Sequence, residues 1–182
     1  MISREEALEL VKLHVKSKNL IKHCLAVEVV MKFLAEKFSE DVNLWAISGL
    51  LHDLDYDYTK DNPENHGLKT IELLKNYDIP QSVKDAILAH CDKKNRVTNM
   101  EKAIYVADPT TGFIVAAALI TPEKSLSSVD TDFLLRRFKE KLFAKGANRD
   151  QMKRCEDLGL SLEEFLTLSL DAMKSISHDL GL

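Results

Sequence analysis

The sequence predicts an all-α protein, and three observations carry this prediction. Helix start signals recur along the chain, apolar residues repeat at helical spacing, and the apolar/polar alternation of a half-buried strand is absent. The clearest start signals have the form of a capping box, in which hydroxyl and carboxyl oxygens satisfy free amides of the first turn. They are Ser3-x-x-Glu6, Thr98-x-x-Glu101 and Ser161-x-x-Glu164.

Prolines and glycines add further boundaries. Pro63 and Pro80 are predicted to occupy the first position of a helix, where proline loses no hydrogen bond and already has a helical φ angle. Gly146 and Gly159 are predicted to end helices, because glycine readily adopts the left-handed conformation that often follows a last turn.

Together these signals predict helices in a fixed order. They lie near residues 4–16, 19–38, 41–53, 63–76, 80–92, 98–119, 130–144, 148–158 and 161–180. No linker, repeat or low-complexity tract separates them, so we expect residues 1–182 to form a single domain. Within it we expect a metal-bearing bundle over about 19–119 and a supporting C-terminal helical extension over about 130–180.

Composition narrows the class of protein. The 182 residues carry a net charge of −4, which gives no general attraction for a nucleic acid polymer. The N-terminus lacks the features of a signal peptide, and the longest apolar stretch, residues 114–120, is far below the roughly 20 residues of a membrane span. Three widely spaced cysteines are typical of free thiols. We therefore expect a cytoplasmic protein without a membrane partner.

An ordered series of metal-type side chains is the most informative functional signal. Imidazole and carboxylate together suit a divalent transition metal, because they offer neutral nitrogen and anionic oxygen donors. Iron, manganese, cobalt, nickel and zinc all fit such a set. The series is His23, His52, Asp53, His66, His90 and Asp108.

Several members of this series interrupt apolar helix faces. His23 continues the stripe of Ala26 and Val30, and His90 continues that of Val83 and Ile87. A buried carboxylate becomes protonated, paired or metal-bound, so clustered polar groups on inward faces favour a shared cation. Taken singly, however, each histidine is more often a hydrogen-bonded core residue or a solvated one. Only the ordered set predicts a metal site.

The sequence around these residues resembles the HD-domain metal-dependent phosphohydrolases. The resemblance rests on the segment 22–28, the run 49–55, the pairs His66-Gly67 and Ala89-His90, and Ala107-Asp108. In that family a histidine, a His-Asp doublet and a distant aspartate bind one metal, and members with two further histidines between them bind two. The residues beyond 137 are similar to a bacterial and archaeal branch of predicted HD hydrolases without an assigned reaction.

The resemblance implies a dinuclear centre with two divalent transition metals per chain, whatever their identity. Asp53 is expected to bridge them and to act in catalysis. His23, His52 and Asp108 complete one site, and His66 and His90 the other. Cys24 and Cys91, next to His23 and His90, are interpreted as packing residues, because adjacent helix positions point about 100° apart.

One departure from the family pattern concerns positive charge. Many HD proteins continue the doublet as His-Asp-Ile-Gly-Lys, whereas this chain continues with Leu54-Asp55-Tyr56. Lys69, one turn beyond His66, is the nearest replacement by helical geometry and our second catalytic candidate, although it is equally consistent with a solvated surface lysine. Asp55 and Asp57 are candidates for contacts behind the ligands, but a role in a turn is the favoured interpretation.

These features predict a metal-dependent phosphohydrolase that cleaves a small phosphoester, nucleotide-like, with metal-activated water. Two alternatives remain open. One is a di-iron oxygenase built on the same ligands, which oxygen consumption would reveal. The other is a non-catalytic module that binds a nucleotide for regulation. The substrate, the general acid and the oligomeric state are not readable from the sequence.

Overall fold

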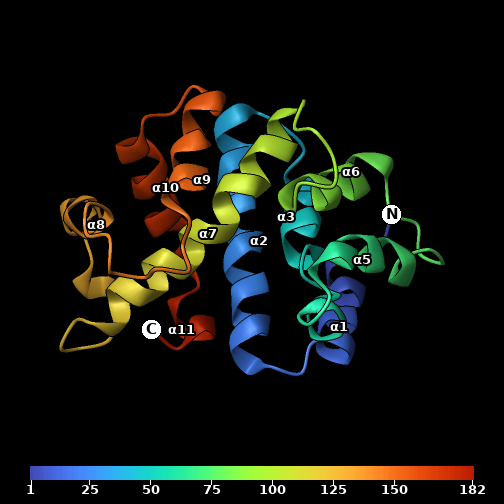
Figure 1. Ribbon diagram of the computed structural model, residues 1–182, viewed down its shortest axis with the longest axis horizontal. Helices are drawn as coiled ribbons and strands as arrows, with labels where there is room; N and C mark the ends of the chain where they lie inside the picture. The colour runs from blue at the N-terminus through green and yellow to red at the C-terminus, as the bar shows by residue number, and fades with distance from the viewer.

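The computed structural model describes residues 1–182 and consists of helices without any strand, which confirms the all-α prediction. Two 21-residue helices, α2 and α7, pass through the centre; α1, α3, α5 and α6 lie on one side and α8 to α11 on the other (Figure 1). The α-helices are α1 (Arg4–His14), α2 (Lys18–Phe38), α3 (Val42–Leu51), α4 (Tyr56–Thr59), α5 (Leu68–Leu73), α6 (Gln81–His90), α7 (Asn99–Leu119), α8 (Thr131–Phe138), α9 (Arg149–Lys153), α10 (Leu162–Ser175) and α11 (Ser177–Leu180). Three short 3-10 helices are η1 (Pro63–Asn65), η2 (Leu126–Ser128) and η3 (Arg154–Leu158).

All three predicted capping boxes are formed. Ser3, Thr98 and Ser161 cap α1, α7 and α10, and in each case the glutamate three residues later returns a hydrogen bond to the backbone of the cap. Gly159 ends η3 with a φ of 73°, as predicted for a glycine after a helix. Local hydrogen bonding thus sets these boundaries.

The single helix predicted over 63–76 is wrong. The chain instead forms η1, breaks at His66 and Gly67, and resumes as α5. The cause is Asp55, whose Oδ2 accepts hydrogen bonds from the amides of Gly67 at 2.7 Å and Thr70 at 3.0 Å and so starts α5 from outside. Gly67 has a φ of +79°, which favours glycine at this break.

Other boundaries also differ from the prediction. Pro80 is the residue before α6 rather than its first residue. The helix predicted over 130–144 ends at Phe138, so Gly146 does not stop it. Arg149 explains this end, because its guanidinium donates to carbonyl oxygens of residues 138, 143, 144 and 147 and holds the segment as turns. The predicted helices over 148–158 and 161–180 each divide in two.

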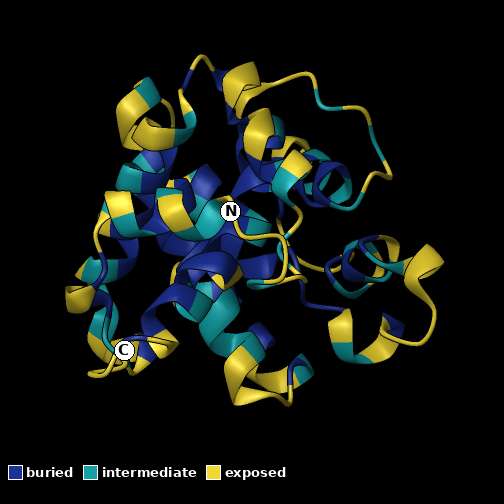
Figure 2. Ribbon diagram, turned by 60° about the vertical axis from the view of Figure 1, so that its left-hand side comes forward, coloured by how far each residue is buried: buried dark blue, intermediate teal, exposed yellow.

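The buried residues form two hydrophobic clusters. The larger one joins α2 and α7 to the C-terminal helices, and the smaller one joins α1, α3 and α6. Buried positions line the inward faces of these helices, while the exposed residues lie at the periphery (Figure 2). Helices α2 and α3 approach closely at Gly49, where a β-carbon would lie 2.9 Å from the carbonyl oxygen of Val27. This close approach brings the end of α3 against the middle of α2.

Candidate metal centre

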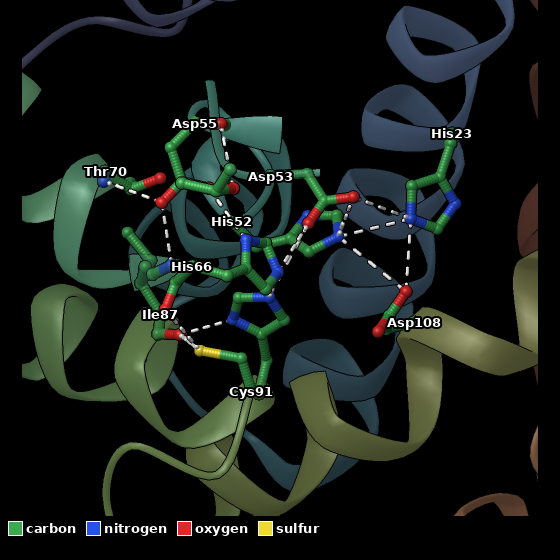
Figure 3. Close-up of polar contacts among 12 residues, drawn as sticks. His23, His52, Asp53, Asp55, His66, Thr70, Ile87, Cys91 and Asp108 are labelled. Carbon is green, nitrogen blue, oxygen red and sulfur yellow. Dashed lines mark hydrogen bonds and ion pairs between the residues drawn. The ribbon is translucent and has the colours of Figure 1, made fainter. Parts of the chain in front are cut away.

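The structure brings the six predicted ligand residues together. Three of them lie on helices, two in the turn after α3, and one in a break of the chain (Figure 3). His23 lies on α2, His52 and Asp53 follow the last turn of α3, His66 lies between η1 and α5, His90 is the last residue of α6, and Asp108 lies on α7.

The carboxylate of Asp53 lies at the centre and faces two groups of imidazoles with its two oxygens. Oδ1 is 3.3 Å from Nε2 of His66 and 3.6 Å from Nε2 of His90. Oδ2 is 3.6 Å from Nε2 of both His23 and His52. Each oxygen therefore shares a different pair of nitrogen donors.

Asp108 belongs to only one of the two groups. Its Oδ1 lies 3.1 Å from Nε2 of His23 and 3.9 Å from Nε2 of His52. Within the pairs, the Nε2 atoms of His23 and His52 are 3.2 Å apart, and those of His66 and His90 are 3.0 Å apart. The donor atoms thus fall into two neighbouring pairs of nitrogens on either side of Asp53, which we call the His23 and the His66 subsites.

Backbone carbonyls fix two of the four rings. Nδ1 of His52 lies 2.8 Å from the carbonyl oxygen of Gly49, and Nδ1 of His90 hydrogen-bonds to the carbonyl oxygen of Ile87. A carbonyl oxygen can only accept, so each Nδ1 carries the proton. In the neutral ring Nε2 is then left with a lone pair directed at the cluster.

A buried carboxylate fixes the third ring. Oδ1 of Asp55 lies 2.8 Å from Nδ1 of His66, and the Asp55 side chain is fully buried. Carboxylate partners of this kind orient metal-binding histidines and fix their tautomer. Because the same carboxylate starts α5, the helix and the ring are positioned by one side chain.

The fourth ring is held by a hydroxyl group. Oγ1 of Thr111 lies 3.0 Å from Nδ1 of His23 and 3.0 Å from the carbonyl oxygen of Asp108. Since that carbonyl can only accept, the hydroxyl donates to it and accepts from Nδ1 of His23. Sequence reasoning did not identify Thr111, although its position one turn after Asp108 was a usable signal.

This donor set fits divalent metal ions. Four Nε2 lone pairs point into a small volume with two carboxylates, and in the neutral rings no hydrogen is available between the paired nitrogens. A cation in each subsite would remove the repulsion between lone pairs and neutralise Asp53 and Asp108. Three groups of side chains have ligand atoms within 4.8 Å of one another: His23 with His52 and Asp108, His52 with Asp53 and His90, and His66 with His90 and Cys91.

The pKa values of these side chains depend on the balance between burial and the nearby carboxylates. Burial opposes a charge on His66, but hydrogen bonds to Asp53 and Asp55 outweigh it and raise the pKa of His66 to about 9. For His52 burial prevails and lowers the pKa to about 4. Burial also acts to raise the pKa of Asp53, yet the surrounding histidines hold it well below its usual range. Asp53 thus stays ionised and recruits protons where no metal is bound.

The surroundings of Lys69 and Cys91 differ from what the sequence predicted. Lys69 forms an ion pair with Glu72 at 2.9 Å and lines a surface pocket that contains none of the six ligand residues. Cys91, interpreted as a packing residue, lies closer to the centre than expected. Its Sγ lies 3.4 Å from the carbonyl oxygen of His66 and within reach of the His66 subsite.

Comparison with known proteins agrees with this geometry. A model of the family described as HD domain matches residues 20–111, half of the chain, and this span includes all six candidate ligand residues. No solved structure was found to match the chain. No helix combines the length and apolar character required to cross a membrane. With half of its length matched and the histidines and aspartates clustered in space, the chain belongs to the HD domain family of metal-dependent hydrolases.

Proposed function

We propose that this protein is a metal-dependent phosphohydrolase with a dinuclear centre, acting on a small phosphoester such as a nucleotide. The observation that carries the proposal is the division of the Asp53 carboxylate between two pairs of imidazole nitrogens. A single subsite would need only one of these pairs. Divalent metals bound there would supply an activated water and neutralise charge on the phosphoryl group.

The chain's own residues prepare the site for this chemistry. Gly49, Asp55, Ile87 and Thr111 each engage a histidine Nδ1, so the rings are oriented before any ligand arrives. His52 and His90 are almost fully buried, whereas Asp108 and His23 are partly accessible. His66 is as exposed as His23, so both subsites have an accessible ligand, and Asp108 is the most exposed of the six residues.

The deciding experiment measures metal content and hydrolysis together. Protein purified without added metal is analysed by elemental mass spectrometry beside His23→Ala and His66→Ala, which each remove a ligand from a different subsite. We expect about two metals per chain in the parent and a loss of one in each variant. Hydrolysis of a phosphoester panel should fall in both variants.

Other outcomes would favour other functions. One metal that survives His66→Ala would reduce the centre to a mononuclear site. Strict dependence on iron with consumption of oxygen would favour a di-iron oxygenase. A protein that takes up no metal under any loading condition would not be a metallohydrolase, and a nucleotide-binding module would remain.

A further inference from the structure

A cleft of about 340 Å³ opens beside His23, between the N-terminal half of α2 and the C-terminal half of α7. Its walls are mainly aliphatic: Ala26 from α2, Val115 and Leu119 from α7, and the segment 180–182. In Figure 1, α11 lies between the ends of these two helices. The cleft thus joins an apolar space to the His23 side of the candidate metal centre.

Lys22 supplies the only cationic side chain of this lining. Its side chain is half-buried and has no hydrogen bond or ion pair with the rest of the chain. A β-carbon at Gly181 would lie 2.8 Å from Nζ of Lys22, so the absence of a side chain there leaves room for the ammonium group. An unpaired, partly desolvated ammonium in the same cleft as His23 favours an anionic partner.

We propose that Lys22 binds the phosphoryl group of the substrate and that this cleft holds its leaving group. The substrate class is a phosphomonoester with one uncharged leaving group of nucleoside size. The inference rests on the proposed phosphohydrolase function. In the reaction, water forms a new P–O bond, the P–O bond to the leaving group breaks, and a proton from water passes to the leaving oxygen. The products are an alcohol and inorganic phosphate.

The charges that line the two clefts favour a substrate with a single phosphate. A second phosphate requires another cation or donor array, and beyond Lys22 the polar side chains of the lining are Asn19, Thr111 and His23, with the carboxylate of Leu182 as an anionic group. A second cleft of about 350 Å³ shares His23 and Gly112 but contains the Asp108 carboxylate and no lysine or arginine. A dinucleotide or cyclic dinucleotide would place its second phosphate against aliphatic or acidic groups.

In this proposal Lys22 supplies the positive charge that is missing after the His-Asp doublet. Lys69 pairs with Glu72 and faces a different pocket, whereas Lys22 precedes a ligand residue on the same helix. Consecutive residues of a helix rise by about 1.5 Å. The two side chains leave α2 about 100° apart, but both line the same cleft.

The first test measures binding of inorganic phosphate to metal-loaded protein by isothermal titration calorimetry. Lys22→Met should raise the Kd for phosphate by about tenfold or more, because a charge-assisted hydrogen bond is lost. Lys22→Arg should recover most of the affinity, and Lys32→Met, on the exposed side of α2, should not change it. Metal content should be equal in all four proteins. An unchanged Kd in Lys22→Met, or a loss in Lys69→Met instead, overturns the assignment.

The second test compares the two clefts with a non-hydrolysable phosphonate analogue of adenosine monophosphate. Leu119→Trp narrows the Lys22 cleft, and Ala116→Trp narrows the other one. Binding of the analogue should weaken at least tenfold in Leu119→Trp alone, while phosphate binding stays constant. The diphosphate analogue should bind no more tightly than the monophosphate. The reverse pattern would place the leaving group in the second cleft and overturn the inference.

Failure of this inference is distinct from failure of the proposed function. If phosphoesters are hydrolysed but the Kd for phosphate and the KM are unchanged in Lys22→Met, the function stands and the role of Lys22 is refuted. If phosphate binding depends on Lys22 but no phosphoester is hydrolysed, the anion site stands and the phosphohydrolase proposal fails.

Discussion

Asp55 connects the orientation of His66 to the start of a helix. One oxygen of its carboxylate accepts a hydrogen bond from Nδ1 of His66 at 2.8 Å, and the other accepts from the amides of Gly67 and Thr70. The side chain is fully buried, so these bonds are not weakened by competing water. The His66 subsite therefore depends on a residue that is not itself a ligand in our assignment.

The first prediction concerns Asp55→Asn. The amide can replace only one of the two acceptor oxygens, so either His66 or the start of α5 loses its partner. We expect metal affinity at the His66 subsite to fall about 10–100-fold, while the His23 subsite keeps its metal. Elemental analysis after dialysis against a weak chelator measures this difference.

Asp57→Asn is the matched control, because it makes the same change two residues away. Asp57 accepts a hydrogen bond from the amide of Lys16 at 2.7 Å and contacts no ligand residue. Its metal content should equal that of the parent protein. Equal occupancy of both subsites in Asp55→Asn would show that the carboxylate has no orienting role.

The second prediction concerns the contact between α2 and α3. In Gly49→Ala the new β-carbon would meet backbone atoms of Val27 and Glu28 at 2.9–3.0 Å, and backbone cannot move aside as a flexible side chain can. We expect a loss of about 1–3 kcal/mol in the free energy of unfolding, from overpacking at this crossing. Urea unfolding of the metal-free protein measures it.

Gly112→Ala is the control for the same substitution inside a helix. A β-carbon at Gly112 meets nothing within 4 Å. Alanine should therefore stabilise α7 by about 0.5–1 kcal/mol through its higher helix propensity. If the two alanine variants had the same free energy of unfolding, the close approach at Gly49 would not contribute to stability.

The six candidate ligand residues show how much of the site could be predicted from the sequence. Their order and helical spacing predicted one cluster, and the structure places them in one. The boundary at 63–76 could not be predicted, because the break at Gly67 is imposed by Asp55 from another part of the chain. Lys22 was equally hidden, since its significance depends on how the segment 180–182 packs against α2. Hydrogen bonds between residues close in the sequence can be predicted from the sequence. Hydrogen bonds between distant residues depend on the fold.

The third prediction is a pH dependence of stability at Glu101. Its buried carboxylate accepts hydrogen bonds from Nζ of Lys94 at 2.9 Å and from the amides of Val97 and Thr98 at 2.6 and 3.0 Å. Burial acts to raise the pKa of Glu101, but these donors outweigh it and lower the pKa. A lowered pKa means that the carboxylate stabilises the fold above its unfolded pKa of about 4.3 and loses this effect at lower pH.

Glu101→Gln should therefore be less stable than the parent by about 1–3 kcal/mol at neutral pH, and the difference should shrink as the pH falls below about 4.3. Urea unfolding at a series of pH values measures both trends. Glu36→Gln, at an exposed position on α2, should have little effect at any pH. A stability difference that persists unchanged into acid would mean that the charge of Glu101 is unimportant.

The fourth prediction separates a neighbouring thiol from a ligand. Sγ of Cys91 lies 3.4, 3.8 and 3.6 Å from the carbonyl oxygens of His66, Ile87 and Leu88. A thiol can donate its hydrogen to such an acceptor. Cys91 is thus placed to brace the His66 backbone as a donor. We expect Cys91→Ser, which keeps a donor, to preserve the metal content and the order of metal affinities.

Cobalt substitution provides the spectroscopic check of this assignment. Cobalt-loaded parent protein should lack the near-ultraviolet charge-transfer band of a sulfur ligand, and Cys91→Ser should have the same visible spectrum. Cys91→Ala removes the donor, so it should weaken the His66 subsite slightly and leave the His23 subsite unaffected. A sulfur band in the parent that disappears in Cys91→Ser would instead make Cys91 a seventh ligand. The centre would then prefer zinc and other thiophilic metals, because a thiolate is a softer donor than imidazole or carboxylate.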